Sequence, residues 1–298
     1  MNPFIIGGAD KTATSSMVAL INASEDAFSL YETDLNSQIP TKYAKRFLDE
    51  FPDSRFLFYS RADYADAYRE FHNYLISRGY KYKIIGDKLP KHSCTFFEKY
   101  RDFKLIYCTR LPAEWLVKVQ STYCVTNDVR PVLFQFLRGL IFAREHSDSL
   151  IITTEKFLSE NDKVVEKVAR HLSIDLNDRM FNWWDTAAIN PQPLKSVQNW
   201  AAAHHSSKMA PKINDTNVIK YDDKFWQPLH QMYNRLVNDD ECDVEFELTM
   251  LKKSLGNNKI ALSDVIEEFN TVSFDYNEGR LSRAIKKITN VVHRNSNR

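Results

Sequence analysis

The chain has 298 residues, of which 43% are hydrophobic and 13% aromatic, and this suffices for one large globular α/β domain or for one domain with an appendage. Forty basic side chains stand against thirty-nine acidic ones, and the formal charge of +1 excludes a global field that would draw the protein onto nucleic acid or an anionic membrane. The four cysteines lack metal-type or redox-type spacing, and no run of about 18 apolar residues occurs. We therefore expect reduced cysteines, no membrane insertion and a cytoplasmic location.

Strand-like and helix-like segments alternate along roughly the first 175 residues. The strand-like runs are short and rich in β-branched and aromatic residues; they read PFIIGG, AFSLYE, RFLFYS, YKYKIIG, FKLIYCT and SLIITT. The segments between them carry apolar residues at spacings of three and four, as from Tyr64 to Leu75. Because strands joined by helical crossovers pair in parallel, this order predicts a three-layer αβα fold with a central, mainly parallel sheet.

The alternation stops near residue 175. A segment rich in Trp, Asn and Pro follows, and apolar spacing then predicts a helix around residues 225–237. The last fifty or so residues are amphipathic and predicted to be helical. We expect an α/β domain over residues 1–240 and a helical C-terminal extension, packed on it, over residues 241–298.

The first strand leads into a loop suited to an anion. Residues 4–16 read FIIGGADKTATSS, so an apolar strand ends in two glycines and passes through small, hydroxylated residues into a helix. Backbone N–H groups in such a loop, together with the N-terminus of the helix, bind phosphate, and Lys11 adds a positive charge. The expected binding residues are Gly8, Ala9, Asp10, Lys11, Thr12, Ala13, Thr14 and Ser15. The alternative is an ordinary strand-to-helix turn.

The order G-x-x-K-T-A-T-S resembles the 5'-phosphosulfate loop of the sulfotransferase family, whose usual form is G-x-x-K-[ST]-G-T-[ST]. Those enzymes take a sulfuryl group from 3'-phosphoadenosine-5'-phosphosulfate (PAPS) without a metal and release PAP. The resemblance implies a P-loop-like fold, PAPS as donor, no metal cofactor, and a Lys11 that stabilises the charge on the bridging oxygen as PAP leaves. Ala13 stands where the family has glycine, and its methyl group is tolerable only if φ is negative.

A second motif follows the strand FKLIYCT. Arg110 and Pro112 match the family's 3'-phosphate motif, a strand followed by R-N-P and a serine eight positions after the arginine. Leu111 replaces the asparagine and Lys118 replaces the serine, so either Lys118 or Ser121, one turn later, is expected to assist Arg110. The planar guanidinium can grip a phosphate through two hydrogen bonds. The alternatives are a surface ion pair for Arg110 and a solvated helix lysine for Lys118.

The expected general base follows the second strand. In the carbohydrate and protein-tyrosine branches of the family, a glutamate about twenty residues past the loop takes the acceptor's proton. Glu32 lies twenty-one residues after Lys11, at the predicted strand end. Asp34 is the second choice, because it shares a face with Glu32 if the chain stays extended. A solvated strand-end acid is the alternative.

The segment YKIIGDKLPKH is similar to the G-[DE]-K-x-P segment of many relatives, in which the lysine faces the reacting centre. The similarity implies that Asp87 and Lys88 line the acceptor pocket and that Lys88 balances charge on the sulfuryl oxygens. An Asp-Lys pair that closes on itself is the alternative. In the late strand and helix, Glu155 and Phe157 are expected to be capping and packing positions.

The resemblance extends well over residues 3 to about 175. It implies a PAPS-dependent sulfotransferase whose partners are PAPS and a hydroxyl-bearing acceptor, either a carbohydrate or another small-molecule or glycan alcohol. Two alternatives stay open: a metal-dependent nucleotide or small-molecule kinase, and a non-catalytic nucleotide-binding relative. The kinase alternative lacks a Gly-Lys-Ser/Thr loop and an evident magnesium acid in this sequence.

Overall fold

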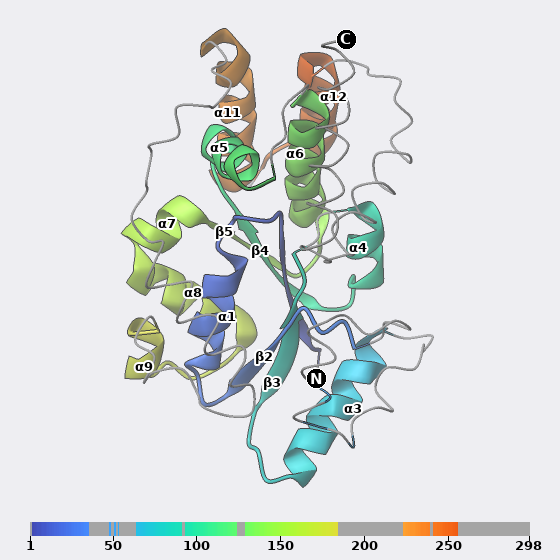
Figure 1. Cartoon of the computed structure of the whole chain (residues 1–298), viewed down its shortest axis with the longest axis vertical. Helices are drawn as coiled ribbons and strands as arrows, with labels where there is room; N and C mark the ends of the chain where they lie inside the picture. Colours follow the sequence, from blue (N-terminus) through green and yellow to red (C-terminus); the bar gives the residue numbers. More distant parts are fainter. Residues whose placement is uncertain are drawn as a thin grey trace, which may run out of the picture. The chain divides into compact units, whose positions relative to one another are not determined.

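The structure is a computed structural model, in which helices surround a central sheet (Figure 1). The described residues are 2–35, 48, 51, 53, 64–90, 93–123, 129–183, 223–238 and 241–255. The chain divides into two units, Met1–Asn257 and Asn258–Arg298, and the second unit lies outside the described residues. The predicted strand RFLFYS also lies outside them.

One parallel sheet forms the middle of the first unit. Its strands are β1 (Phe4–Gly8), β2 (Ala27–Tyr31), β3 (Ile84–Lys88), β4 (Lys104–Thr109) and β5 (Ser149–Thr153). The spatial order is β2-β3-β1-β4-β5, and every pairing between these strands is parallel. Strands β1, β2 and β3 are buried along their whole length, as expected for a sheet covered on both faces. The predicted α/β class with a central, mainly parallel sheet is confirmed.

Helices cover both faces of the sheet. They are α1 (Thr14–Asn22), α3 (Tyr64–Ser77), α4 (Cys94–Lys99), α5 (Pro112–Tyr123), α6 (Arg130–Glu145), α7 (Thr154–Ser159), α8 (Asn161–Leu172), α9 (Asp178–Phe181), α11 (Asp223–Asn238) and α12 (Val244–Leu255). Helices α1, α8 and α9 lie on one face, while α3, α4 and α6 lie on the other (Figure 1). None of the described helices combines the length and the apolar character needed to cross a membrane.

The helices begin and pack as their sequences dictate. Ser93, Thr153 and Asn177 each cap a helix by accepting a hydrogen bond from the backbone N–H three residues further along the chain. Helix α8 shows the expected apolar stripe; its buried residues are Val164, Val165, Val168, Ala169 and Leu172. The burial of such stripes packs the helices against the sheet. This packing holds the strands, and therefore the strand ends, in fixed positions.

Helices α11 and α12 pack on α5 and α6. The two are joined by Arg235 and Glu247, whose side chains form a two-pronged ion pair with the Glu247 carboxylate buried. Helix α12 falls in the predicted C-terminal extension and contacts α6. A domain boundary at residue 240 stays a prediction.

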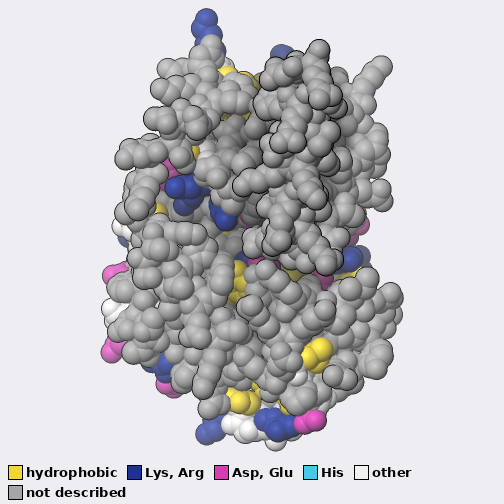
Figure 2. All heavy atoms as spheres, viewed as in Figure 1, with side chains coloured by type: hydrophobic (Ala, Val, Ile, Leu, Met, Phe, Trp, Pro, Cys, Tyr) yellow, Lys and Arg dark blue, Asp and Glu magenta, His cyan; other side chains and the backbone are white. Residues whose placement is uncertain are grey.

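Figure 2 shows one face of the molecule, on which the described Lys and Arg side chains lie in small groups among acidic and apolar ones. This mixture agrees with the near balance of charge in the sequence.

Candidate functional site

The loop between β1 and α1 has a backbone of the kind that binds anions. Lys11 and Ala13 adopt left-handed conformations, with φ of 69° and 65°. Left-handed residues at alternate positions belong to the nest geometry, in which successive backbone N–H groups turn toward one concavity. Helix α1 begins directly afterwards, with no side-chain cap and no acidic residue in its first turn. Its first N–H groups and its positive dipole end are therefore available to an anion.

Ala13 does not meet the condition of a negative φ, because its φ is 65°. A left-handed conformation is allowed for alanine but unfavourable, by roughly 1–2 kcal/mol. The Thr12 hydroxyl donates to the Ala9 carbonyl at 2.7 Å, and the Ala13 carbonyl accepts the first helical bond from Met17. The loop is thus held in this shape by its own hydrogen bonds and by the start of α1.

Gly8 is required at the end of β1. Its φ is 134°, and a Cβ atom placed there would lie 2.3 Å from the backbone oxygen of Cys108 on the neighbouring strand. Only glycine permits this close approach of β1 to β4. The turn into the loop consequently starts beside β4.

Arg110 lies at the same sheet edge, in the turn that follows β4. Gly8 of β1 pairs with Cys108 of β4 in the parallel sheet. Lys11 lies three residues after Gly8 and Arg110 lies two residues after Cys108, so both leave the sheet from the same paired position. The Trp115 indole of α5 donates to the Asp10 carbonyl at 2.8 Å and so ties the two loops together. The structure thus brings the Lys11 loop and the Arg110 turn side by side.

The Arg110 side chain is half-buried and its Nε is buried without a hydrogen-bond partner among the described residues. Burial lowers the pKa of its guanidinium, and the negative charges of Glu155 and Glu114 oppose this effect. An arginine stays charged under such conditions. A buried, unpaired guanidinium nitrogen is costly and suits an anionic ligand.

The turn around Arg110 is anchored from α7. The backbone N–H of Leu111 donates to a Glu155 carboxylate oxygen at 2.9 Å, and the Thr154 hydroxyl donates to the Thr109 carbonyl at 3.0 Å. Phe157 is buried and stacks on Trp183. Glu155 and Phe157 therefore hold structural positions, as the sequence indicates. Lys118 lies half-buried on α5, and the Ser121 side chain lies outside the described parts.

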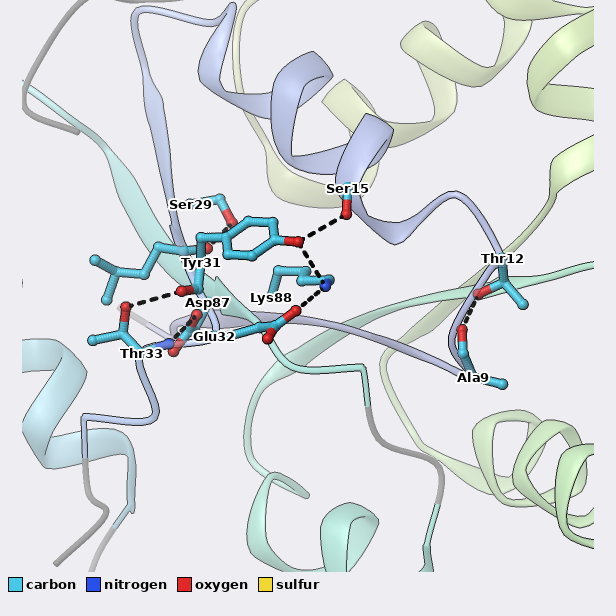
Figure 3. A network of polar contacts seen from close by, with 10 residues as sticks. Ala9, Thr12, Ser15, Ser29, Tyr31, Glu32, Thr33, Asp87 and Lys88 are labelled. Atoms are coloured by element: carbon cyan, nitrogen blue, oxygen red, sulfur yellow. Dashed lines mark hydrogen bonds and ion pairs between the residues drawn. The ribbon is translucent and has the colours of Figure 1, made fainter. Parts of the chain in front are cut away.

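A polar network occupies the ends of β2 and β3 (Figure 3). The Lys88 ammonium forms an ion pair with the Glu32 carboxylate and donates to the Tyr31 hydroxyl at 3.3 Å. It also lies 4.4 Å from the centre of the Tyr31 ring, within cation–π range. The Tyr31 hydroxyl lies 3.2 Å from the Ser15 hydroxyl of α1. Tyr31 thus connects the anion loop with the Glu32–Lys88 pair.

Lys88 is buried, whereas the Glu32 side chain is 25% exposed. Burial and the neighbouring Glu32 charge raise the pKa of Tyr31, so the phenol stays neutral. The carboxylate therefore reaches solvent while its ammonium partner is fixed behind it.

The chain does not stay extended after β2. Glu32 and Asp34 have φ of 51° and 49°, both left-handed, and Asp34 therefore does not share a strand face with Glu32. The Tyr100 hydroxyl donates to the Asp34 carboxylate at 2.9 Å. Asp34 nevertheless lies at the same strand end as Glu32.

Asp87 lies fully buried on β3, beneath this turn. Its carboxylate accepts from the backbone N–H of Asp34 at 2.7 Å, from that of Thr33 at 3.3 Å and from the Tyr68 hydroxyl at 3.2 Å. Burial raises the pKa of Asp87 to about 7, against the lowering effect of these hydrogen bonds. Acceptor binding by Asp87 stays a prediction.

Sequence patterns did not single out the aromatic residues of this site. Tyr31, Tyr68 and Tyr100 are tied by their hydroxyls to Lys88, Asp87 and Asp34. The only available signal was the place of Tyr31 beside Glu32, since the other contacts join segments far apart in the chain. Within the described residues, no three His, Cys, Asp or Glu side chains are grouped as potential metal ligands.

No protein-family model and no curated protein sequence match the chain. Several solved structures resemble it in fold. Sulfotransferase STF9 from Mycobacterium avium has 14% identity and a TM-score of 0.45 over 80% of this chain and 77% of its own. The sulfotransferase domain from the curacin biosynthetic pathway has 13% identity and a TM-score of 0.43 over 70% of this chain and 99% of its own.

Mouse sulfotransferase SULT7A1, solved with PAP, has 10% identity and a TM-score of 0.42 over 85% of this chain and 88% of its own. At such identities and TM-scores these likenesses assign no function to the chain. The functional assignment therefore depends on the residues of the site itself.

Proposed function

We propose that the chain is a sulfotransferase that transfers a sulfuryl group from PAPS to a hydroxyl acceptor. One observation carries this proposal: four neighbouring strands present the required groups at a single sheet edge. In the order β2-β3-β1-β4, these groups are Glu32, Lys88, the Lys11 loop and Arg110. Ligands of open parallel sheets bind at the carboxyl ends of the strands.

The β1 and β4 ends suit the nucleotide. Backbone N–H groups of residues 9–15, with Thr12, Thr14 and Ser15, would hold the 5'-phosphosulfate at the N-terminus of α1. Arg110 would pair with the 3'-phosphate, and Lys118 or Ser121 would assist. The Arg110 Nε, which has no partner among the described residues, is an independent indication of this role. The residues present therefore fit a nucleotide with anionic groups at both the 5' and the 3' position.

The β2 and β3 ends suit the acceptor. The acceptor hydroxyl would lie beside Glu32, with Asp34 and Lys88 around it and Asp87 buried beneath the turn that carries Glu32. As its oxygen forms a bond to sulfur, the bond from sulfur to the bridging oxygen breaks, and that oxygen with its electron pair stays on PAP. The acceptor's proton passes to Glu32.

The two cations have separate tasks. Lys11 would stabilise the negative charge that develops on the bridging oxygen, and Lys88 would balance the charge on the sulfuryl oxygens. Lys88 is held behind Glu32 by the ion pair and by Tyr31, so it can face the reacting centre while the Glu32 carboxylate remains ionised. An ionised carboxylate is the form that accepts a proton.

A transfer assay tests the proposal. Purified protein is incubated with PAPS and a panel of sugars, phenols and glycan alcohols, with a metal chelator present, and sulfated products are detected by mass spectrometry. We expect turnover without metal and a loss of about 100-fold or more in kcat for Glu32→Gln. Glu25→Gln is the matched control, because Glu25 is a surface acid whose nearest described partner is Arg179 at 3.5 Å.

Three results would contradict the proposal. They are no sulfated product from any acceptor, undiminished turnover in Glu32→Gln, and phosphoryl transfer that requires ATP with Mg²⁺. The last result would support the kinase alternative.

A further inference from the structure

Asp87 is the one fully buried carboxylate on the described strands, and its partners lie in the turn that carries Glu32. We propose that Asp87 is a positioning residue: its carboxylate holds the backbone of residues 33–34 and thereby fixes Glu32 where it can take the acceptor's proton. This inference rests on the proposed function and deepens it.

The turn needs such support because its backbone is strained. Glu32 and Asp34 both adopt left-handed conformations, which side-chain-bearing residues disfavour. The Asp87 carboxylate accepts the N–H groups of Thr33 and Asp34, so it engages the two residues that directly follow Glu32. Strain of this kind persists only where surrounding contacts determine the conformation.

Two adjacent residues of β3 thus act on one turn. β2 and β3 pair in parallel with Tyr31 opposite Lys88, and the Lys88 carbonyl accepts the Glu32 N–H at 2.8 Å. Lys88 fixes the Glu32 side chain through its ammonium, and Asp87 fixes the backbone beyond Glu32. These separate roles explain why the Asp87 side chain faces inward, whereas the side chain of Lys88, the next residue of β3, reaches Glu32.

The surroundings of Asp87 are hydrogen-bonding groups. Tyr68 of α3 donates to its carboxylate, while Asp34 of the turn and Tyr100 at the end of α4 interact with it electrostatically. Burial raises the pKa of Asp87 to about 7. Protonation would remove the negative charge that strengthens both N–H hydrogen bonds, so the hold on the turn weakens as pH falls through about 7.

Hydrogen exchange on the full chain tests the hold directly and needs no substrate. In the wild type, we expect the protection factors of the Thr33 and Asp34 amides to fall as pH is lowered from about 8 to about 6. At about pH 8, Asp87→Asn should lower both by about tenfold or more, while the Ile5 and Ile6 amides of β1 lose no protection. Asp175→Asn, an exposed acid in a surface ion pair, is the control.

Kinetics supply the second readout. Asp87→Asn should lower kcat by about tenfold or more with KM for PAPS unchanged, and it should remove the acid limb near pH 7 from the wild-type kcat profile. Pure destabilisation would not remove a limb of the profile. Asp175→Asn should leave kcat and the profile unchanged.

The inference is overturned if wild-type protection of both amides is independent of pH, if Asp87→Asn loses protection uniformly across the sheet, or if its kcat and pH profile match the wild type. The wild-type exchange measurement remains decisive if Asp87→Asn does not fold. If the wild type sulfates no acceptor, the proposed function fails. A selective loss of protection at the Thr33 and Asp34 amides would then show that Asp87 stabilises the turn without a role in sulfuryl transfer. The two failures are therefore distinguishable.

Discussion

Replacing Asp87 by Asn should make the protein more stable at neutral pH although it impairs the proposed site. Asn has nearly the shape of the neutral acid, so the substitution removes the charge from a fully buried position. The pKa of Asp87 is raised to about 7 by burial in the folded protein, whereas an aspartate in the unfolded chain has a pKa of about 3.9. Between these two values the folded state holds a proton that the unfolded state has lost.

The free energy of unfolding of the wild type therefore contains a contribution that is fully present below about pH 4 and is lost as pH rises to about 7. A difference of about 3 pKa units corresponds to roughly 4 kcal/mol at 1.36 kcal/mol per unit, and this is an upper estimate for a single buried carboxyl. The variant lacks this titration. The stability of Asp87→Asn minus that of the wild type should rise by up to about 4 kcal/mol between about pH 4 and about pH 8.

Urea denaturation of both proteins at several pH values measures this difference, in which the titrations of all other groups largely cancel. A difference that does not change with pH would refute the reasoning, and so would one that falls as pH rises. A gain in stability together with a loss of kcat would show a stability–activity trade-off at this strand end.

Three other substitutions have defined outcomes. Ala13→Gly should raise the free energy of unfolding by about 0.5–1 kcal/mol in urea denaturation, because it relieves the left-handed alanine at some cost in chain entropy; an unchanged or lower stability would contradict this. Tyr31→Phe should lower kcat about fivefold in the transfer assay, since Lys88 loses a hydroxyl partner worth about 1 kcal/mol but keeps the aromatic ring; an unaltered kcat would argue against the network. Gly8→Ala should cost more than about 3 kcal/mol by the same denaturation assay, whereas Gly79→Ala, with open space around its position, should cost about 1 kcal/mol; equal losses would contradict the close approach at β1.

The sheet could be predicted from the sequence because its signals are local. The runs that form β1 to β5 are short, apolar and bounded by turn residues, and the helical crossovers between them dictate parallel pairing. The Gly-Gly loop and the turn at Arg110 could also be placed, since both directly follow such strands. Parallel strands bring their carboxyl ends to one edge, so the proximity of these two loops follows from the alternation itself.

The interior of the site could not be predicted in the same way. The sequence shows Asp87 only as part of a G-D-K-L-P segment, and its contacts with residues 33–34 arise because β2 and β3 pair across more than fifty residues of chain. The left-handed turn at Glu32 contains no glycine, so the sequence gives no signal for its positive φ angles. The positive φ of Ala13 runs against residue preference, and the hydrogen bonds within the loop and at the start of α1 hold the conformation there.

Binding of PAP in the absence of metal tests the central claim, that one nucleotide spans the Lys11 loop and the Arg110 turn. Titration calorimetry compares PAP with AMP, which lacks the 3'-phosphate, on the wild type and on Arg110→Ala. The wild type should bind PAP more tightly than AMP, and Arg110→Ala should weaken PAP by about tenfold or more while leaving AMP nearly unchanged, so that the two ligands bind alike. Equal affinity of the wild type for both ligands, or an equal loss for both in the variant, would contradict the account.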